Sequence, residues 1–232
     1  EKEKFAGARA TYSVEAMMQD GKALQSGTSH NFGTNFSEPF EIKYLDKDGT
    51  QKYAYETSWG TSTRLIGAII MTHGDERGLK LPPMIAPYQV VVVPVAAHKE
   101  GVLEGAKAVA DKLTAAGLRV KFDDRDNVTP GWKFNEWELK GVPIRVEIGP
   151  RDLAEGKVMS VRRDTFEKAP LDIEDLEGEI KAMLDAIQTN MFEIARAFRD
   201  AHTADVHNME ELGKQVAGGS AKAMWCGDQA CE

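Results

Sequence analysis

The chain has 232 residues, of which 42% are hydrophobic and 28% charged, so it is long enough for two modest domains with a core each. Its formal net charge of -8 lies in one segment, residues 171–212, which carries 11 acidic and 3 basic side chains, so the overall charge does not exclude a nucleic-acid partner. No apolar run reaches the roughly 18 residues of a membrane span, and residues 1–7 lack the apolar stretch of a signal peptide, so we expect a cytoplasmic protein without a membrane partner.

The first 60 residues predict antiparallel hairpins. Polar and apolar residues alternate from Thr11 to Ala16, the turn sequence "QDGK" follows, and "ALQSGTSHNFG" supplies a second strand. The stretches "FEIKYL", "DKDG" and "KYAYETS" repeat this plan of strand, turn and strand. The segment is therefore predicted to be rich in antiparallel sheet.

From Thr63 onward the pattern changes twice. Apolar residues at helical spacing follow Thr63, and "HGDERG" ends that helix; "LPPMIAP" is then a plausible linker. After it come a buried strand in "QVVVVPV", a helix over residues 102–116, a strand in "LRVKFDD", a helix in "GWKFNEWELKG", and strands in "VPIRVEIG" and "KVMSVRR". This alternation is typical of an α/β domain, and a long acidic helix over about residues 171–202 is expected to follow it.

Arg64 stands at the start of the first predicted helix, directly after small and hydroxyl residues. Backbone N–H groups, hydroxyls and a guanidinium would meet at this point, and such a combination favours phosphate. The spacing by itself is a weak signal and favours the alternative, a solvated residue at a helix start.

Three stretches of the sequence, in order, resemble those of one enzyme family. "FAGARATYSVEAMMQDGKALQSGTSHNFG" is similar to part of the catalytic domain of class II aminoacyl-tRNA synthetases, and "TSWGTSTRLIGAIIMTHGDERGLKLPPMIAPYQVVVVPV" to their third signature motif in its prolyl-tRNA synthetase form. "DDRDNVTPGWKFNEWELKGVPIRVEIGPRDL" resembles the anticodon-binding domain of the eukaryote-like and archaeal-like branch. The resemblance implies an antiparallel-sheet (α+β) catalytic part over residues 1–85, an α/β anticodon-binding domain over 86–168, and a helical, acidic extension over 169–232.

The resemblance assigns roles in the catalytic part. Arg64 would contact the ATP phosphates, with Ser62 and Thr63 beside it, and Gln25 and Thr28 would hold the adenine and ribose. The proline pocket would be lined by His30, Trp59, Gly60 and Ser62. Read without the family, His30 would be a hydrogen-bonded structural histidine, Trp59 a core aromatic residue, and Gln25 and Thr28 ordinary polar strand positions.

The implied reaction is activation of L-proline by ATP to prolyl-adenylate, followed by transfer to tRNA(Pro). Enzymes accelerate such displacement at phosphorus mainly by positioning and by neutralising charge, commonly with Mg²⁺ and arginine. The family's first motif builds a homodimer interface and its second supplies another arginine, and neither motif is found in this sequence. We therefore expect a fragment that starts after the second motif and is inactive alone.

The resemblance also implies an anticodon site. Glu138 of "WELKG", Arg145 of "PIRVE" and Arg151 of "GPRD" would meet the guanines of a proline anticodon, and DNA is not an expected partner. An ion pair between Glu138 and Arg145 is the alternative interpretation. Trp132 and Trp137 are better explained by core packing than by base stacking.

The two cysteines, Cys226 and Cys231, lie near the C-terminus in a stretch similar to the family's cysteine-containing extension. They are too few for a disulfide framework, and a structural zinc site needs four ligands, so we expect two free thiols rather than a bound zinc ion. Two other function classes stay open: a non-catalytic tRNA-binding accessory module, and a nucleotide-binding structural domain unrelated to tRNA.

Overall fold

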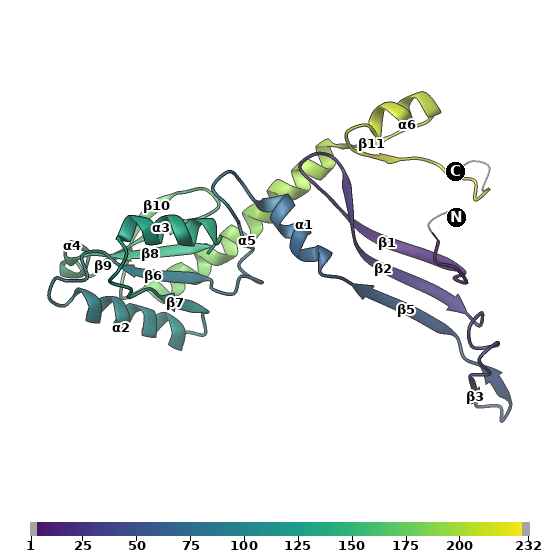
Figure 1. The fold of residues 1–232 in the computed structure, drawn as a ribbon, viewed down its shortest axis with the longest axis horizontal. Coiled ribbons are helices and arrows are strands. Elements are labelled where there is room, and N and C mark those ends of the chain that lie inside the picture. The colour runs from purple at the N-terminus through teal and green to yellow at the C-terminus, as the bar shows by residue number, and fades with distance from the viewer. Residues whose placement is uncertain (1–3, 229–232) are drawn as a thin grey trace. The chain divides into compact units, whose positions relative to one another are not determined.

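The computed structural model describes residues 4–228, and these form two compact units (Figure 1). One unit holds the described residues up to Thr72 together with those from Phe198 onward, and the other is His73–Ala197. The two are called the sheet unit and the α/β unit below. No helix within residues 4–228 is long and apolar enough to cross a membrane.

The sheet unit is built on three antiparallel strands in the order β1-β2-β5. They are β1 (Ala10–Met17), β2 (Ala23–Gly33) and β5 (Glu56–Thr61). The predicted first hairpin is confirmed: its turn is closed by a bond from Met18 N to Lys22 O of 2.8 Å, and Gly21 adopts the left-handed φ of 79° that this turn needs. Alternation in the sequence thus yields a sheet with two different faces.

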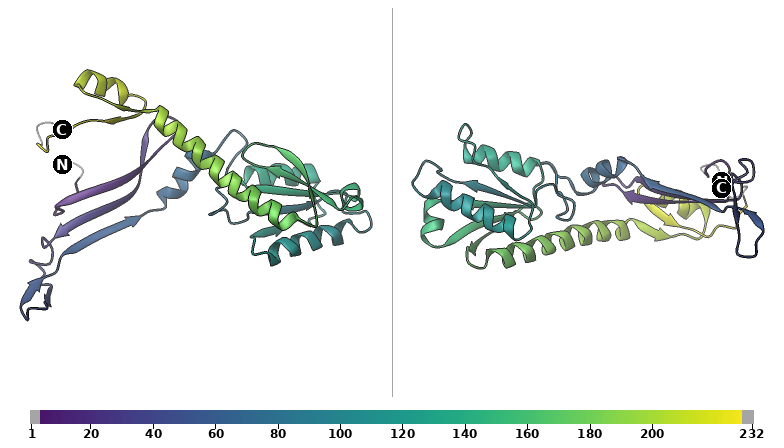
Figure 2. Two further views of the ribbon diagram at one scale, coloured as in Figure 1. Left: turned by 180° about the vertical axis from the view of Figure 1, so that it is seen from behind. Right: turned by 90° about the horizontal axis from the view of Figure 1, so that it is seen from below.

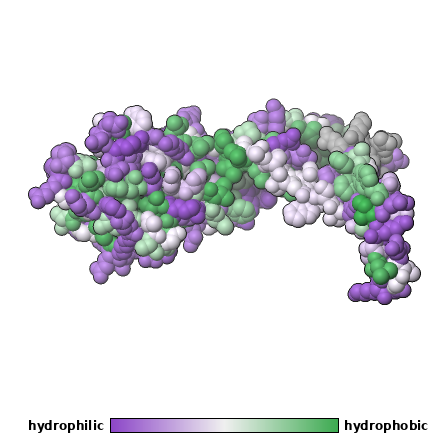
Figure 3. Space-filling model, turned by 60° about the horizontal axis from the view of Figure 1, so that its bottom comes forward, coloured by the Kyte–Doolittle hydropathy of each residue, from purple (hydrophilic) through white to green (hydrophobic). Residues whose placement is uncertain are grey.

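The second predicted hairpin is shorter than the sequence indicates. Strand β3 (Lys43–Leu45) pairs with β4 (Gln51–Tyr53), but the rest of the predicted strand "KYAYETS" separates as β5 and pairs with β2 instead. The region around this hairpin exposes apolar side chains, such as Phe40 and Leu45, and hydrophobic surface is visible there in Figure 3. Helix α1 (Arg64–His73) then begins and ends where the sequence predicts.

The last part of the chain contains three short elements that the sequence analysis did not predict. Strands β11 (Thr203–Asp205) and β12 (Ser220–Lys222) pair in parallel, and α6 (Met209–Gln215) joins them. Asn208 caps α6, because its side chain accepts a bond from Glu211 N at 2.9 Å.

The α/β unit has a five-stranded sheet in the order β10-β9-β8-β6-β7. The strands are β6 (Val90–Pro94), β7 (Val120–Phe122), β8 (Ile144–Ile148), β9 (Lys157–Arg162) and β10 (Lys168–Asp172). The helices are α2 (Val102–Ala115), α3 (Pro130–Leu139), α4 (Pro150–Ala154) and α5 (Leu176–Ala201). Strands β6, β7 and β8 are parallel, whereas β9 and β10 run antiparallel to their neighbours.

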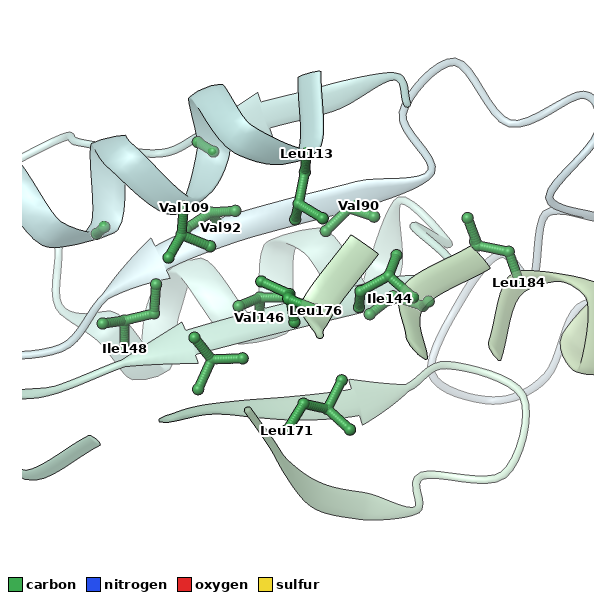
Figure 4. Close-up of a cluster of buried hydrophobic side chains, with 14 of the residues drawn as sticks. Val90, Val92, Val109, Leu113, Ile144, Val146, Ile148, Leu171, Leu176 and Leu184 are labelled. Atoms are coloured by element: carbon green, nitrogen blue, oxygen red, sulfur yellow. The ribbon is translucent and has the colours of Figure 1, made fainter. Parts of the chain in front are cut away.

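Helices cover both faces of this sheet (Figures 1 and 2). Val90 and Val92 of β6 point into one core with residues of α2 and α5, whereas Val91 and Val93 pack on the other side with Trp137 of α3. The larger core is drawn in Figure 4, where side chains of α2 and α5 meet those of β6 and β8. A continuous valine run is what a strand buried on both faces requires.

The long acidic helix begins later than the sequence indicates. Leu171 was expected to open it, but Leu171 lies in β10 and α5 starts at Leu176. Pro170 is part of β10, which is an edge strand, where proline is tolerated. The apolar face of α5 is buried in the larger core of the α/β unit.

Candidate functional sites

The strand β2 carries Gln25, Thr28 and His30 on one face of the sheet. These three lie opposite alternate residues of β1, namely Glu15, Ser13 and Thr11. Residues directly opposed across antiparallel strands share a face, and alternate residues of one strand do too. Gln25 and Thr28 could not share a face in a regular strand, but the register of β2 shifts beside Ser26, and this bulge turns Gln25 to the side of Thr28.

Arg64 reaches this face from the start of α1. Its Nη1 donates to Gln25 Oε1 at 3.2 Å, and its backbone N donates to Ser62 Oγ at 3.3 Å. Gly60 lies opposite Thr28, and a Cβ added at Gly60 would meet no atom within 4 Å. Guanidinium, amide and hydroxyl groups therefore converge beside open space, as binding of a phosphorylated ligand requires.

His30 is held in place by neighbours on the same sheet. Its Nδ1 lies 3.0 Å from Thr11 Oγ1, and its ring lies against Phe5 and Phe32, with centroids 5.0 and 5.9 Å away. A fixed imidazole beside Thr28 is compatible with a ligand contact and with a structural role alike.

Trp59 is not brought together with His30. It lies opposite Ser29, which in turn lies opposite Tyr12, so Trp59 and Tyr12 share the other face of the sheet. The residue is 79% exposed. The predicted pairing of His30 and Trp59 around one ligand is therefore not seen among the described residues.

A cleft of about 930 Å³ runs along β1 within the sheet unit. Gln25, Thr11 and Ser13 line it from the sheet, and Leu212 and Trp225 line it from the C-terminal segment. This volume is sufficient for a nucleotide-sized ligand. Thr28, His30 and Arg64 do not line the cleft, although the first two share the sheet face with Gln25.

A metal site is not evident in the described part of the chain. Residues 4–228 contain no group of three or more His, Cys, Asp or Glu side chains that could hold an ion. Cys226 is exposed, and Cys231 lies outside the described residues. The described residues thus offer no ligand cluster of the kind that a structural zinc site needs, whereas Mg²⁺ held by nucleotide phosphates needs no such cluster.

The α/β unit brings Glu138 and Arg145 together at the end of α3. Arg145 Nη1 lies 3.9 Å from Glu138 Oε2, and both side chains are 15% exposed. Arg145 is bound more closely by Glu147, at 3.0 Å from Nε and 2.9 Å from Nη2, and its guanidinium lies 4.4 Å from the Phe134 ring centroid. The ion-pair interpretation therefore describes Glu147 better than Glu138 as the partner of Arg145.

Arg151 lies apart from these two residues. It is an exposed residue of the short helix α4, which follows the carboxyl end of β8, whereas Arg145 is near the amino end of that strand. Three strand steps separate Arg145 from Ile148, or about 10 Å at the usual rise, and Arg151 lies beyond Ile148 in α4. This separation suits contacts with two bases of one anticodon better than contacts with a single base.

The two tryptophans of α3 have different surroundings. Trp137 is 5% exposed and donates from Nε1 to Asp123 Oδ2 at 2.7 Å, which confirms core packing. Trp132 is 51% exposed with Arg125 over its ring, so the prediction of core packing is wrong for it. Trp132 lies in the first turn of α3, whereas Trp137 lies further along the helix and packs against Val91 and Val93.

Sequence reasoning missed Arg77 and Phe166, which both lie next to Glu138. Arg77 Nη1 donates to Glu138 Oε1 at 3.1 Å, and the Arg77 guanidinium lies 4.5 Å from the centroid of the Phe166 ring. Phe166 adopts a left-handed φ of 61°, which is unusual for a bulky residue. In the sequence, Arg77 was only part of the turn that ends a helix.

Comparisons with known proteins agree with this arrangement. Residues 89–183 match the family described as "Anticodon binding domain". The whole chain is 58% identical to a proline–tRNA ligase of Lachnospira eligens, 56% to one of Alkaliphilus oremlandii and 57% to one of Clostridium novyi. In each case the match covers 100% of this chain and 48–49% of the relative, so the chain spans about half the length of the curated relatives it matches. The predicted resemblance is confirmed: the chain is similar over its whole length to about half of proline–tRNA ligases, and residues 89–183 match the anticodon-binding family.

Proposed function

We propose that the complete protein activates L-proline with ATP and transfers the prolyl group to tRNA(Pro), and that this chain contributes an ATP-binding sheet face and the anticodon site. The observation that carries the proposal is the identity of 55–58% to proline–tRNA ligases along the whole chain. The convergence of Gln25, Thr28 and Arg64 on one side of the sheet unit supports it.

In the activation step the proline carboxylate attacks the α-phosphorus of ATP and pyrophosphate leaves. Arg64 would neutralise phosphate charge, with Ser62 and Thr63 at the same helix start, while Gln25 and Thr28 hold the nucleoside. The contact between Arg64 and Gln25 would orient the guanidinium before ATP binds. No general base is needed, because the attacking carboxylate is already ionised.

Proline-dependent exchange of pyrophosphate into ATP tests this function. This chain alone should show no exchange, and co-expression with the remaining half of the Lachnospira eligens protein should restore it. Exchange by the purified chain alone would refute the expectation that it is inactive. No exchange in a folded, co-purifying complex would count against the proposed activity.

We propose that His30, Gly60 and Ser62 border the proline-binding part of the same face, with Trp59 as a more distant member. The complemented enzyme is this chain co-expressed with the remaining half of the Lachnospira eligens protein. His30→Ala in the complemented enzyme should raise the proline concentration for half-maximal exchange more than it alters the ATP dependence. A change in the ATP dependence alone would assign His30 to the nucleotide site or to the fold.

For the anticodon we propose that Glu138, Arg145 and Arg151 contact the two guanines. Acidic and basic residues nearly balance over residues 88–164, so binding should depend on placed contacts rather than on general attraction. Arg151→Ala should weaken binding of a proline-anticodon stem-loop more than binding of a loop without the guanines. Equal weakening of both would reduce Arg151 to a phosphate contact.

The homodimeric state, the cytosolic location and the use of ATP as its Mg²⁺ complex are parts of the same proposal. Size-exclusion chromatography of the complemented enzyme tests the first. Dependence of pyrophosphate exchange on added Mg²⁺ tests the use of the Mg²⁺ complex of ATP. The ion would be bound by the nucleotide or by the other half of the protein.

A non-catalytic tRNA-binding module is the second candidate function. The observation in its favour is that the chain matches only about half of each relative while containing the anticodon-binding domain. Stem-loop binding without any gain of exchange on complementation would favour this module over the synthetase.

A further inference from the structure

The segment that follows α1, residues 75–81, folds back onto the end of α3. Asp75 accepts two bonds from the buried Arg163, at 2.7 and 2.9 Å, and Arg163 in turn donates to Glu138 O at 2.9 Å. Leu79 N donates to Leu139 O at 2.9 Å. A Cβ at Gly78, whose φ is 123°, would lie 2.6 Å from Leu139 O, so only glycine permits this approach.

This docking fixes the position of Arg77. Its backbone N donates to Asp75 Oδ1 at 2.9 Å, its guanidinium lies over the Phe166 ring, and its Nη1 binds Glu138. Arg163 Cζ also lies over the Phe166 ring, 5.2 Å from its centroid. The guanidinium is thus held beside the carboxylate by several contacts, although the Arg77 side chain is 62% exposed.

The two arginines beside Glu138 differ in their capacity for further hydrogen bonds. Arg145 is 15% exposed, donates from Nε to Glu147 and forms an ion pair with it through Nη2. Within residues 4–228, Arg77 uses one of its side-chain N–H groups, the one bound to Glu138. A guanidinium has five, so Arg77 keeps donors that face solvent.

The hollow beside Glu138 is very small. It is lined by Glu138, Arg145 and Phe166 among others, and its volume is about 10 Å³, which is at the limit for one water molecule. A base cannot enter it, so a base that meets Glu138 must approach from the solvent side, where Arg77 lies.

A carboxylate with an arginine N–H group beside it is complementary to one base. The Watson–Crick edge of guanine presents two donors, N1–H and N2–H, next to the acceptor O6. Adenine presents an acceptor at N1 and a donor at N6. Its acceptor would face the carboxylate, which is also an acceptor, and its donor would face the arginine, which is also a donor. Building on the anticodon recognition proposed above, we propose that Arg77 is a further specificity residue: it donates to O6 of the anticodon guanine whose N1–H and N2–H groups are bound by Glu138.

The test uses the 232-residue chain and four stem-loops, with binding followed by fluorescence anisotropy. One loop carries a proline anticodon, one has its guanines replaced by adenine, one has them replaced by inosine, and one has an unrelated anticodon without guanine. Inosine keeps O6 and N1–H but lacks the N2 amino group, so it removes a contact of Glu138 and leaves the contact of Arg77 intact.

Arg77→Ala should lower the preference for guanine over adenine by about tenfold, within the range for one well-placed arginine contact to guanine. It should leave the preference for guanine over inosine unchanged, because both bases carry O6. Glu138→Gln should instead reduce the preference for guanine over inosine. Arg77→Lys, which keeps the charge and loses the planar fork, should retain only part of the guanine preference.

Arg196→Ala is the matched control. Arg196 also pairs with a glutamate, Glu193, lies over a phenylalanine ring, that of Phe192, and has a side chain that is 50% exposed, but it belongs to α5. The control should bind all four loops as the unsubstituted chain does. Thermal unfolding of both variants should be near that of the unsubstituted chain, since both side chains are largely exposed.

Three results would overturn the assignment of Arg77. Equal weakening of all loops would make it a phosphate contact, a loss of the guanine–inosine preference would make it only a support for Glu138, and no change would leave it without a role in recognition. A different result concerns the proposed function itself: if the unsubstituted chain does not prefer the proline anticodon, anticodon recognition by this chain is refuted, whatever Arg77 does.

Discussion

The two units bury their strands to very different extents. In the α/β unit every residue of β6 is buried, because helices cover both faces of the sheet. In the sheet unit one face of β1-β2-β5 leaves Tyr12, Val14 and Trp59 between 69% and 79% exposed. Strands can thus form from local pairing in both units, but only one of them builds a core on both sides.

The sequence contains the reason for this contrast. The run "VVVV" has no polar face, so it requires covering on both sides, whereas β1 alternates Thr11, Ser13 and Glu15 with Tyr12 and Val14. A sheet that leaves an apolar face uncovered gains less free energy from burial than a sheet that is covered on both faces. We therefore expect substitutions in the α/β unit to cost far more stability than substitutions on the exposed face.

The largest effect is expected for Leu113→Ala, in α2. Leu113 is completely buried in the larger core, and removing a leucine side chain from such a site costs about 2–5 kcal/mol. Leu103→Ala is the control in the same helix, since Leu103 is 38% exposed. Urea unfolding, monitored by hydrogen exchange of the β6 amides, measures the loss of unfolding free energy in both variants. Similar losses in the two would contradict the assignment of the core.

Arg64→Ala is expected to have the next largest effect, on activity rather than stability. Loss of one charge-stabilising donor costs about 3 kcal/mol, so exchange by the complemented enzyme should fall by one to two orders of magnitude or slightly more. Lys22→Ala serves as a control, because the Lys22 side chain is 83% exposed in a turn. Unchanged exchange in Arg64→Ala would remove Arg64 from the ATP site.

The sequence predicted more of the fold than of the sites. Hairpins and buried strands follow from local pattern, and α1, α2 and α3 lie where periodicity places them. The bulge beside Ser26 could not be predicted, because it depends on pairing with β1, and it decides that Gln25 shares a face with Thr28. Arg77 was missed for a similar reason: only tertiary contacts bring residues 75–81 next to Glu138.

The third prediction concerns Asp123, whose side chain is 1% exposed and lies beneath α3. Burial raises the pKa of Asp123, but hydrogen bonds from Arg125 and Trp137, together with the positive charges of Lys133 and Arg125, lower it to about 2. Because the folded pKa lies below the unfolded value, the stabilisation is present above pH 4 and is lost as the pH falls towards 2. It amounts to roughly 2 kcal/mol.

Asp123→Asn should therefore destabilise the α/β unit at pH 7, and the difference from the unsubstituted chain should shrink between pH 4 and pH 2. Asp111→Asn is the control, since Asp111 forms an exposed ion pair with Lys107 and such pairs contribute little. Urea midpoints across this pH range measure both variants. A difference that is independent of pH would show that packing, rather than the charge, is what Asp123 supplies.

The smallest effect is expected on the exposed sheet face, and it tests the contrast most directly. Tyr12 is 69% exposed, so Tyr12→Ser in this chain should change the free energy of unfolding by less than about 0.5 kcal/mol. In the complemented enzyme the same substitution should cost more if the other half of the protein covers this face, because a buried tyrosine contributes 1.5–3 kcal/mol or so. A large loss already in the chain alone would mean that Tyr12 is buried in solution, and the difference between the two units would then disappear.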